Sequence, residues 1–169
     1  MNNREVRIAE KQDLSTIQQL AEKIWPVTYA AIMDAEQIDY MMKKIYSRPS
    51  LLKQMDEDHH IFLILDYESK PSGFASFSIF TGEEKGKLQK IYLDPALQGK
   101  GLGKFLLEDV VARVKAAGGK TLQLNVNRQN QARSFYERQG FVVIRAEDID
   151  IGEGFYMNDY VMEADLVDG

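Results

Sequence analysis

Hydrophobic residues along the chain follow two periods, and each period predicts one kind of element. Apolar side chains recur every three or four positions in segments that are typical of amphipathic helices. Asp13 and Asp34 are the expected N-caps of the first two predicted helices, a third begins at Leu102, and two short ones cover 47–55 and 129–139. Pro26 lies in the first of them and is expected to end or kink it, because proline cannot donate the helical backbone hydrogen bond.

Shorter apolar runs, rich in β-branched and aromatic residues, predict strands between turn signals. They cover 5–9, 61–67, 74–80, 88–93, 121–126, 141–151 and 155–166. Strands and helices therefore alternate along the chain, which indicates a mixed α/β fold with helices on both faces of a sheet. No repeat, linker or low-complexity segment interrupts the pattern, so a single domain over 1–169 is predicted.

The composition narrows the class of protein. Of 169 residues, 44% are hydrophobic and 28% charged, which is typical of a globular domain with one core. No apolar run approaches the roughly 20 residues of a membrane span, and the N-terminus lacks the apolar core of a signal peptide. A net charge of −5 argues against general nucleic-acid binding, and the absence of cysteine excludes disulfides and a cysteine nucleophile. A cytoplasmic protein without membrane or nucleic-acid partners is expected.

A glycine-rich loop between a predicted strand and a predicted helix carries the clearest chemical signal. Asp94-Pro95 ends the strand, and the loop then reads Gln98-Gly99-Lys100-Gly101-Leu102-Gly103-Lys104. Glycine lets the backbone approach a ligand, and the first N–H groups of a helix attract anions. The loop therefore predicts a phosphate or pyrophosphate site; the alternative is a glycine-rich connection without a ligand.

The spacing of these glycines excludes two common phosphate motifs. A Walker loop requires Gly-Lys-Ser/Thr, but Gly103-Lys104 is followed by Phe105. The dinucleotide fingerprint Gly-x-Gly-x-x-Gly fails because the glycines lie at 99, 101 and 103. The pattern that does fit is Gln-x-x-Gly-x-Gly, formed by Gln98, Gly101 and Gly103.

With this pattern the chain resembles the GCN5-related N-acetyltransferases, the GNAT family, in which the motif holds the pyrophosphate of acetyl-CoA. The segment from Asn130 to Phe141 is similar to a second family motif, Asn…Ala-x-x-Phe-Tyr-x-x-x-Gly-Phe. The resemblance extends from about Arg4 to Leu166. It implies a mixed, mostly antiparallel central sheet, and an enzyme that transfers the acetyl group of acetyl-CoA to an amine by direct attack in a ternary complex.

The resemblance also assigns roles to individual residues. It implies that backbone groups of Ile91, Tyr92 and Leu93 hold the pantetheine arm, and that the loop holds the pyrophosphate. The loop residues concerned are Gln98, Gly99, Lys100, Gly101, Leu102, Gly103 and Lys104. Asn130 would contact the cofactor through its side-chain amide, with a helix N-cap as the alternative role.

Tyr136 is the expected acid for the departing thiolate of the cofactor, carried over from the family's Phe-Tyr pair. A phenol with a pKa near 10 stays protonated at neutral pH and can donate to sulfur. The alternative is an aromatic side chain that only packs in the core.

The base that deprotonates the acceptor amine is not supplied by the resemblance. An alkyl amine has a pKa of about 10.4, so only about one molecule in 10³ is the free base at pH 7. Many relatives place a glutamate two residues before the Ile-Tyr pair, but here Gln89 occupies that position and is kept as an acceptor-site residue. The alternatives for the group that accepts this proton are water, Asp148, Asp150 and Asp159.

The acceptor is indicated by weaker similarities. Residues 24–55, the Ile-Tyr-Leu strand and 155–162 are most similar to bacterial spermidine/spermine N-acetyltransferases, which implies a small polycation. Trp25 and Tyr29 fall in the region that flanks the family's acceptor site, with core packing as the alternative. The acid-rich stretch between Glu147 and Asp159 would attract a polyamine.

Other classes of function remain as alternatives. A protein N-terminus, an amino acid or an aminoglycoside could be the acceptor, or the domain could bind acetyl-CoA and regulate a partner without turnover. No metal cofactor is expected, because His59-His60 lacks a third ligand at regular spacing. A small-molecule amine is the expected partner of a monomer or homodimer.

Overall fold

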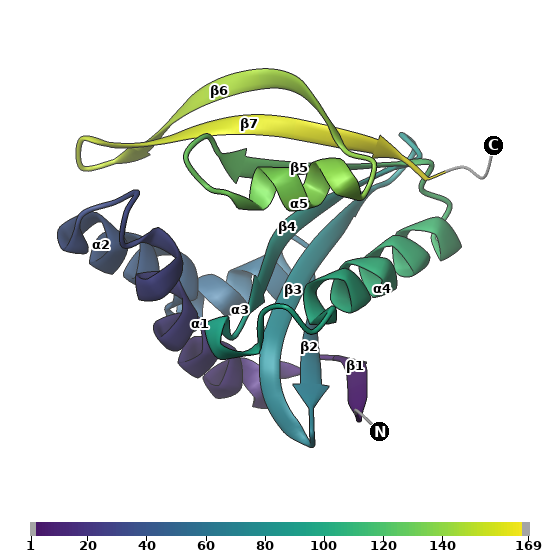
Figure 1. Ribbon diagram of the computed structural model, residues 1–169, viewed down its shortest axis with the longest axis horizontal. Coiled ribbons are helices and arrows are strands. Elements are labelled where there is room, and N and C mark those ends of the chain that lie inside the picture. Colours follow the sequence, from purple (N-terminus) through teal and green to yellow (C-terminus); the bar gives the residue numbers. More distant parts are fainter. Residues whose placement is uncertain (1–2, 167–169) are drawn as a thin grey trace. The chain divides into compact units, whose positions relative to one another are not determined.

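The computed structural model describes residues 3–166, in which five α-helices and seven strands follow one another in the predicted order (Figure 1). The strands are β1 (Arg4–Ile8), β2 (Ile61–Tyr67), β3 (Lys70–Phe80), β4 (Lys85–Leu93), β5 (Thr121–Asn127), β6 (Val142–Gly152) and β7 (Phe155–Asp165). The α-helices are α1 (Leu14–Tyr29), α2 (Ala35–Tyr46), α3 (Arg48–Asp56), α4 (Leu102–Ala116) and α5 (Ala132–Arg138). Short 3₁₀ helices precede α1 and follow β4, at Lys11–Asp13 and Pro95–Leu97.

Two compact units divide the chain. The first comprises Met1–Ser78 and Gln89–Val110, and the second comprises Ile79–Leu88 and Val111–Gly169. Neighbouring strands follow the order β1-β2-β3-β4 in the first unit and β4-β5-β7-β6 in the second, with β4 running through both. The β4–β5 pair is parallel, whereas β1–β2, β2–β3, β5–β7 and β6–β7 are antiparallel. The mixed, mostly antiparallel α/β class is therefore confirmed, and the single domain stays a prediction.

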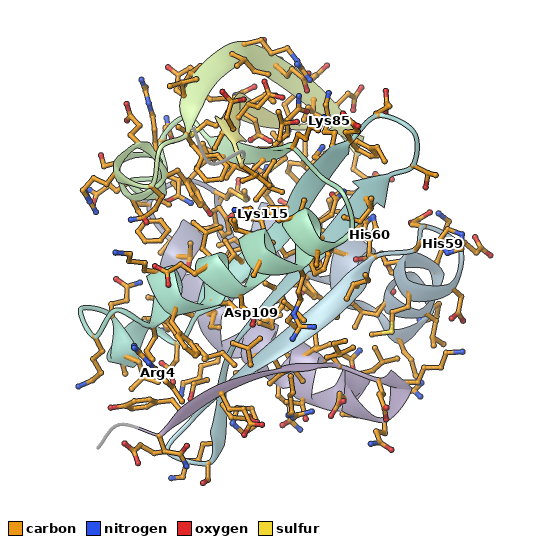
Figure 2. The ribbon with its side chains drawn as sticks, turned by 90° about the vertical axis from the view of Figure 1, so that its right-hand side faces the viewer. Arg4, His59, His60, Lys85, Asp109 and Lys115 are labelled. Atoms are coloured by element: carbon orange, nitrogen blue, oxygen red, sulfur yellow. The ribbon has the colours of Figure 1, made fainter. Side chains whose placement is uncertain are left out.

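The first unit packs helices on both sides of its strands. Figures 1 and 2 show α1, α2 and α3 on one side of β2 and β3, and the beginning of α4 on the other. Strands β3 and β4 approach closely, since Asp94 N donates to Ser72 O at 2.8 Å. A Cβ added to Gly73 would lie 2.8 Å from Tyr92 O, so glycine is required at this contact.

The second unit has one apolar and one polar face on its β5–β7 pair. Leu124 lies opposite Met162 and both are buried, whereas Gln123 lies opposite Glu163 and their side chains are 3.3 Å apart in a hydrogen bond. Strand β6 is the outer strand of this unit, because it has β7 as its neighbour on one side and the strand order ends at β6. The register of β6 on β7 shifts between Val143 and Arg145.

Four local predictions need correction. Helix α1 does not end at Pro26 but continues to Tyr29, because Trp25 before the proline and Tyr29 after it are both buried in the core. Strand β3 begins at Lys70 rather than Phe74. The turn needs only Glu68 and Ser69, both at positive φ, and Pro71 is tolerated opposite Asp66, where the register shifts.

The other two corrections concern Asp13 and the start of β4. Asp13 precedes α1 but makes no side-chain cap for it; its carboxylate instead accepts from Glu10 N at 2.8 Å. Strand β4 begins at Lys85 rather than Leu88, and Gly86 within it is buried. The predicted cap at Asp34 is confirmed, since its Oδ1 accepts from Gln37 N at 2.8 Å.

Candidate active site

The glycine loop leads directly into the first turn of α4. Phe105 N donates to Gly101 O at 3.0 Å, so helical bonding starts at Gly101. Gly99 and Gly101 have φ angles of +85° and +75°, a region that side-chain-bearing residues rarely adopt. A Cβ added to Gly99 would meet no atom within 4 Å, so open space adjoins the backbone there. The loop therefore fits an anion held by backbone N–H groups.

The side chains of the loop divide by exposure. Gln98, Lys100 and Lys104 are exposed and can contact a ligand, whereas Leu102 is buried and offers only its backbone N–H. Lys104 Nζ lies 3.9 Å from Glu108 Oε1 in an exposed pair one helical turn apart, which costs little to open.

Arg4 lies beside the same loop and was not predicted as a site residue. Its guanidinium lies over the ring of Phe105, 4.5 Å from the ring centroid, close to the start of α4 (Figure 2). A Cβ added to Gly101 would lie 4.0 Å from Arg4 Nη1. The guanidinium thus adds positive charge at a helix N-terminus, where an anion is already favoured. No motif spacing could have revealed this, because only the pairing of β1 in the sheet brings Arg4 to the loop.

An aromatic cluster joins two sets of predicted residues, one for the acceptor and one for the cofactor. Trp25 Nε1 donates to Tyr46 Oη at 3.0 Å, and the hydroxyl oxygens of Tyr29 and Tyr92 are 2.8 Å apart. The ring centroids of Trp25 and Tyr92 are 5.8 Å apart, so the β4 strand and α1 meet in this cluster. Burial raises the pKa of Tyr46 well above its ordinary value. Trp25 and Tyr29 are buried, as the packing role requires, and their place in the acceptor wall stays a prediction.

Two polar residues of β4, Gln89 and Lys90, shortly precede Tyr92 of this cluster in the sequence. Gln89 Nε2 donates to Ser78 Oγ at 3.0 Å, which fixes the side chain that replaces the usual glutamate. Lys90 Nζ donates to Gln54 Oε1 at 2.5 Å and lies 5.3 Å from the centroid of the Phe62 ring. Burial lowers the pKa of Lys90 to about 8, only partly offset by the charge of Asp58.

The lowered pKa of Lys90 predicts how stability depends on pH. Between about pH 8 and 10.5 the unfolded chain keeps a proton on Lys90 that the folded protein has lost, so the free energy of unfolding rises with pH in this window. We expect the rise between pH 8 and 10 to be smaller in Lys90→Met than in the wild type by about 2 kcal/mol. Urea unfolding at both pH values measures it, with the exposed Lys43→Met as control; equal rises in wild type and Lys90→Met would contradict the assignment.

The second unit holds Asn130 and Tyr136. Asn130 Oδ1 accepts from the N–H of Ala132, the first residue of α5, at 2.9 Å. The N-cap position of α5 is Gln131, whose side chain makes no cap bond, so the alternative role of Asn130 as N-cap is wrong by one residue. Tyr136 lies on α5 and is only 7% exposed. Its ring packs edge-on against Phe135 and Phe141, with centroids 5.4 and 5.9 Å away. These contacts fix the orientation of the ring.

The acidic residues of β6 and β7 have different environments. Asp148 Oδ1 accepts from Arg128 Nη2 at 2.7 Å, and Glu147 Oε1 accepts from Arg145 Nε at 2.7 Å. Asp150 is exposed and accepts from Gly152 N at 2.9 Å. Asp159 alone among the three candidate bases is buried.

The predicted residues thus fall into two groups. The glycine loop, 91–93, Gln89 and the aromatic cluster belong to the first unit, and Asn130, Tyr136 and Asp159 belong to the second. A sequence model described as an acetyltransferase (GNAT) domain matches residues 29–164. The chain belongs to the GNAT family. As a GNAT N-acetyltransferase, it takes the acetyl group from acetyl-CoA.

Similarity to individual proteins extends over nearly the whole chain in two cases and over part of it in a third. A spermidine N(1)-acetyltransferase of Thermoplasma acidophilum is 33% identical over 90% of this chain and 94% of its own length. The crystal structure of a PaiA N-acetyltransferase from the same organism, in complex with coenzyme A, is 31% identical and covers 96% of this chain and 99% of that chain, with a TM-score of 0.82. A ribosomal protein bS18-alanine N-acetyltransferase of Haemophilus influenzae is 32% identical over 62% of this chain and 67% of its own.

Two further features of this GNAT chain concern the described residues 3–166. None of the helices there is long and apolar enough to cross a membrane. No group of three or more His, Asp or Glu side chains in that part of the chain could hold a metal ion, and His59 and His60 simply follow α3 (Figure 2).

Proposed function

We propose that this enzyme acetylates a primary amine of a small polycation such as spermidine. The observation that carries the proposal is the 33% identity with a spermidine N(1)-acetyltransferase over 90% of the chain. The chain's acidic balance supports it, because a net charge of −5 raises the local concentration of a cationic acceptor. The family relationship shows the acetyl transfer, and the acceptor is what the proposal adds.

Several residues are proposed to hold the cosubstrate. Acetyl-CoA supplies an activated acetyl group when bound. The N–H groups of the loop from Gln98 to Lys104 would receive its pyrophosphate, with the positive φ of Gly99 and Gly101 exposing the backbone. Backbone groups of 91–93 would hold the pantetheine arm, and Asn130 would use its amide nitrogen, since its oxygen already accepts from Ala132 N.

Other residues are proposed to act on the reacting groups. The Tyr136 hydroxyl would give its proton to the departing sulfur, because a neutral thiol is a better leaving group than an unprotonated thiolate. Trp25, Tyr29 and Gln89 would shape the acceptor side. The hydrogen bond from Gln89 to Ser78 would keep that side chain in place.

A substrate panel tests the acceptor. We expect kcat/KM for spermidine to exceed that for butylamine by about tenfold or more at low salt, because the acidic protein attracts a polycation more strongly. Added salt should raise KM for spermidine and leave KM for butylamine nearly unchanged, because screening shortens the reach of surface charge.

A paired variant links this preference to the acids of β6. Asp148→Asn with Asp150→Asn should lower kcat/KM for spermidine several-fold and leave that for butylamine unchanged. Equal kcat/KM for spermidine and butylamine would contradict the polyamine proposal. A peptide with an N-terminal alanine belongs in the panel, because the relative from Haemophilus influenzae is named as a ribosomal protein bS18-alanine N-acetyltransferase. Preferred use of this peptide over spermidine would contradict the polyamine proposal and favour a protein substrate.

A further inference from the structure

Asp159 is a buried carboxylate with one unsatisfied oxygen. The residue is 6% exposed, and its Oδ2 accepts from Asn125 Nδ2 at 3.2 Å. Its Oδ1 is buried and has no hydrogen-bond partner among the described residues 3–166. A buried carboxylate oxygen without a donor costs free energy, and a donor on a bound ligand would relieve that cost.

The strand register places Asp159 on a defined face of the second unit. Asp159 lies opposite Asn127 of β5 and opposite Glu147 of β6, and directly paired residues share a face. The next residue, Tyr160, points to the other face, where the guanidinium of Arg133 from α5 lies 4.7 Å from its ring centroid. Asp159 therefore projects from the face that α5 does not cover.

The positive charges near Asp159 do not offset the effect of burial on the pKa of its carboxyl group. Burial raises the pKa of Asp159, and the negative charge of Glu147 raises it further, against the Asn125 hydrogen bond and the positive charges of Arg128 and Lys87. Arg128 directs its Nη2 to Asp148 and its Nε to the backbone oxygen of Asp159, so its guanidinium does not hydrogen-bond this carboxylate. A carboxylate with a raised pKa holds a proton closer to neutral pH and is a stronger base than an exposed one.

We propose that Asp159 is the general base that takes the proton from the acceptor's ammonium group, with Oδ1 as the accepting atom. This assignment rests on the proposed amine acetylation. The ammonium N–H bond breaks and an O–H bond to Oδ1 forms, which leaves a neutral amine for attack on the acetyl carbon. The N–C bond then forms, the C–S bond breaks, and Tyr136 gives its proton to the departing sulfur. The nitrogen loses a second proton in this step, and that proton restores the hydroxyl of Tyr136. The proton on Asp159 then passes to water, so one proton is released for each acetyl group transferred.

The other two candidate carboxylates fit this role less well. Asp148 is already paired with Arg128 at 2.7 Å, and Asp150 is exposed and accepts from Gly152 N. Both also alternate with Glu147 along β6 and so lie on the face opposite to Asp159. The structure thus ranks the three carboxylates that the sequence left equivalent.

The pH dependence of Asp159→Asn tests the assignment. With spermidine at saturation, we expect kcat at pH 7 to fall by about 10²–10⁴. The loss should shrink toward pH 10, where the amine itself is largely free base. Acetyl-CoA affinity, measured by calorimetry, should be unchanged. The variant should fold, because at pH 7 it removes a buried charge that disfavours the native state.

A matched control and a second variant keep the outcomes distinct. Asp165→Asn changes the same residue type on the same face of β7 at an exposed position and should leave kcat unchanged. Asp159→Ala should regain activity when formate is added, because formate can enter the vacated space and accept the proton. An equal loss at every pH from 6 to 10, or a rise in KM for spermidine with kcat unchanged, would overturn the base assignment. A wild-type enzyme that acetylates no amine would instead refute the proposed function, and the base assignment with it.

Discussion

Tyr136→Phe should lower kcat by about 10²–10⁴, the usual contribution of a positioned acid, with little change in acetyl-CoA affinity. The ring is held by Phe135 and Phe141 and is 7% exposed, so the phenylalanine should occupy the same position. The substitution therefore removes a proton donor and leaves the packing of α5 intact. Single-turnover kinetics measures the chemical step directly, and calorimetry measures the affinity.

A second tyrosine of the same unit provides the control. Tyr156 lies on β7 and is 53% exposed, so Tyr156→Phe should leave both quantities unchanged. If Tyr136→Phe shows the wild-type single-turnover rate, the assignment of Tyr136 as the acid is wrong and its role is core packing. A large loss of acetyl-CoA affinity would point to a binding role instead.

Gly101→Val should abolish acetyl-CoA binding in a protein that still folds. Gly101 has a φ of +75°, where a β-branched residue is strained, so the loop backbone must change and its N–H groups must turn away from the anion. The added side chain would also approach Arg4, whose Nη1 lies 4.0 Å from the new Cβ. Calorimetry should detect no binding at concentrations that saturate the wild type.

Gly82→Val is the matched control for this loss. Gly82 has a φ of +85° and no atom within 4 Å of an added Cβ, so its substitution imposes the same backbone strain in the turn between β3 and β4. We expect it to lower the free energy of unfolding by about 1–3 kcal/mol without affecting acetyl-CoA binding. If a folded Gly101→Val binds acetyl-CoA as the wild type does, the loop is only a connection.

The fold was largely predictable because its signals are local. Periodicity and turn residues gave the order of elements and the cap at Asp34, and the glycine spacing led to the family. The errors arose where contacts distant in sequence override local preference. Pro26 stays inside α1 because the residues around it are buried, and Pro71 stays inside β3 because the strand pairing shifts opposite it.

The candidate site could be proposed from the sequence only where a motif marks it. The loop from Gln98 to Lys104 and the Phe-Tyr pair at 135–136 carry such motifs. Arg4, Lys90 and Asp159 carry none, since their environments arise from strand pairing and burial. The sequence left Asp148, Asp150 and Asp159 equivalent, and the difference between them depends on which face of a strand each occupies and on the position of Arg128.

The outer position of β6 has a consequence for aggregation. Its first residues, Val142, Val143 and Ile144, are exposed apolar side chains on a strand with an open edge, an arrangement that favours pairing with another chain. The acids that follow along the same strand oppose such pairing by repulsion. Changing Asp148 and Asp150 to asparagine moves the net charge from −5 to −3 and weakens that repulsion, so light scattering should accompany the kinetics of this variant. The same two positions would then serve both acceptor attraction and colloidal stability.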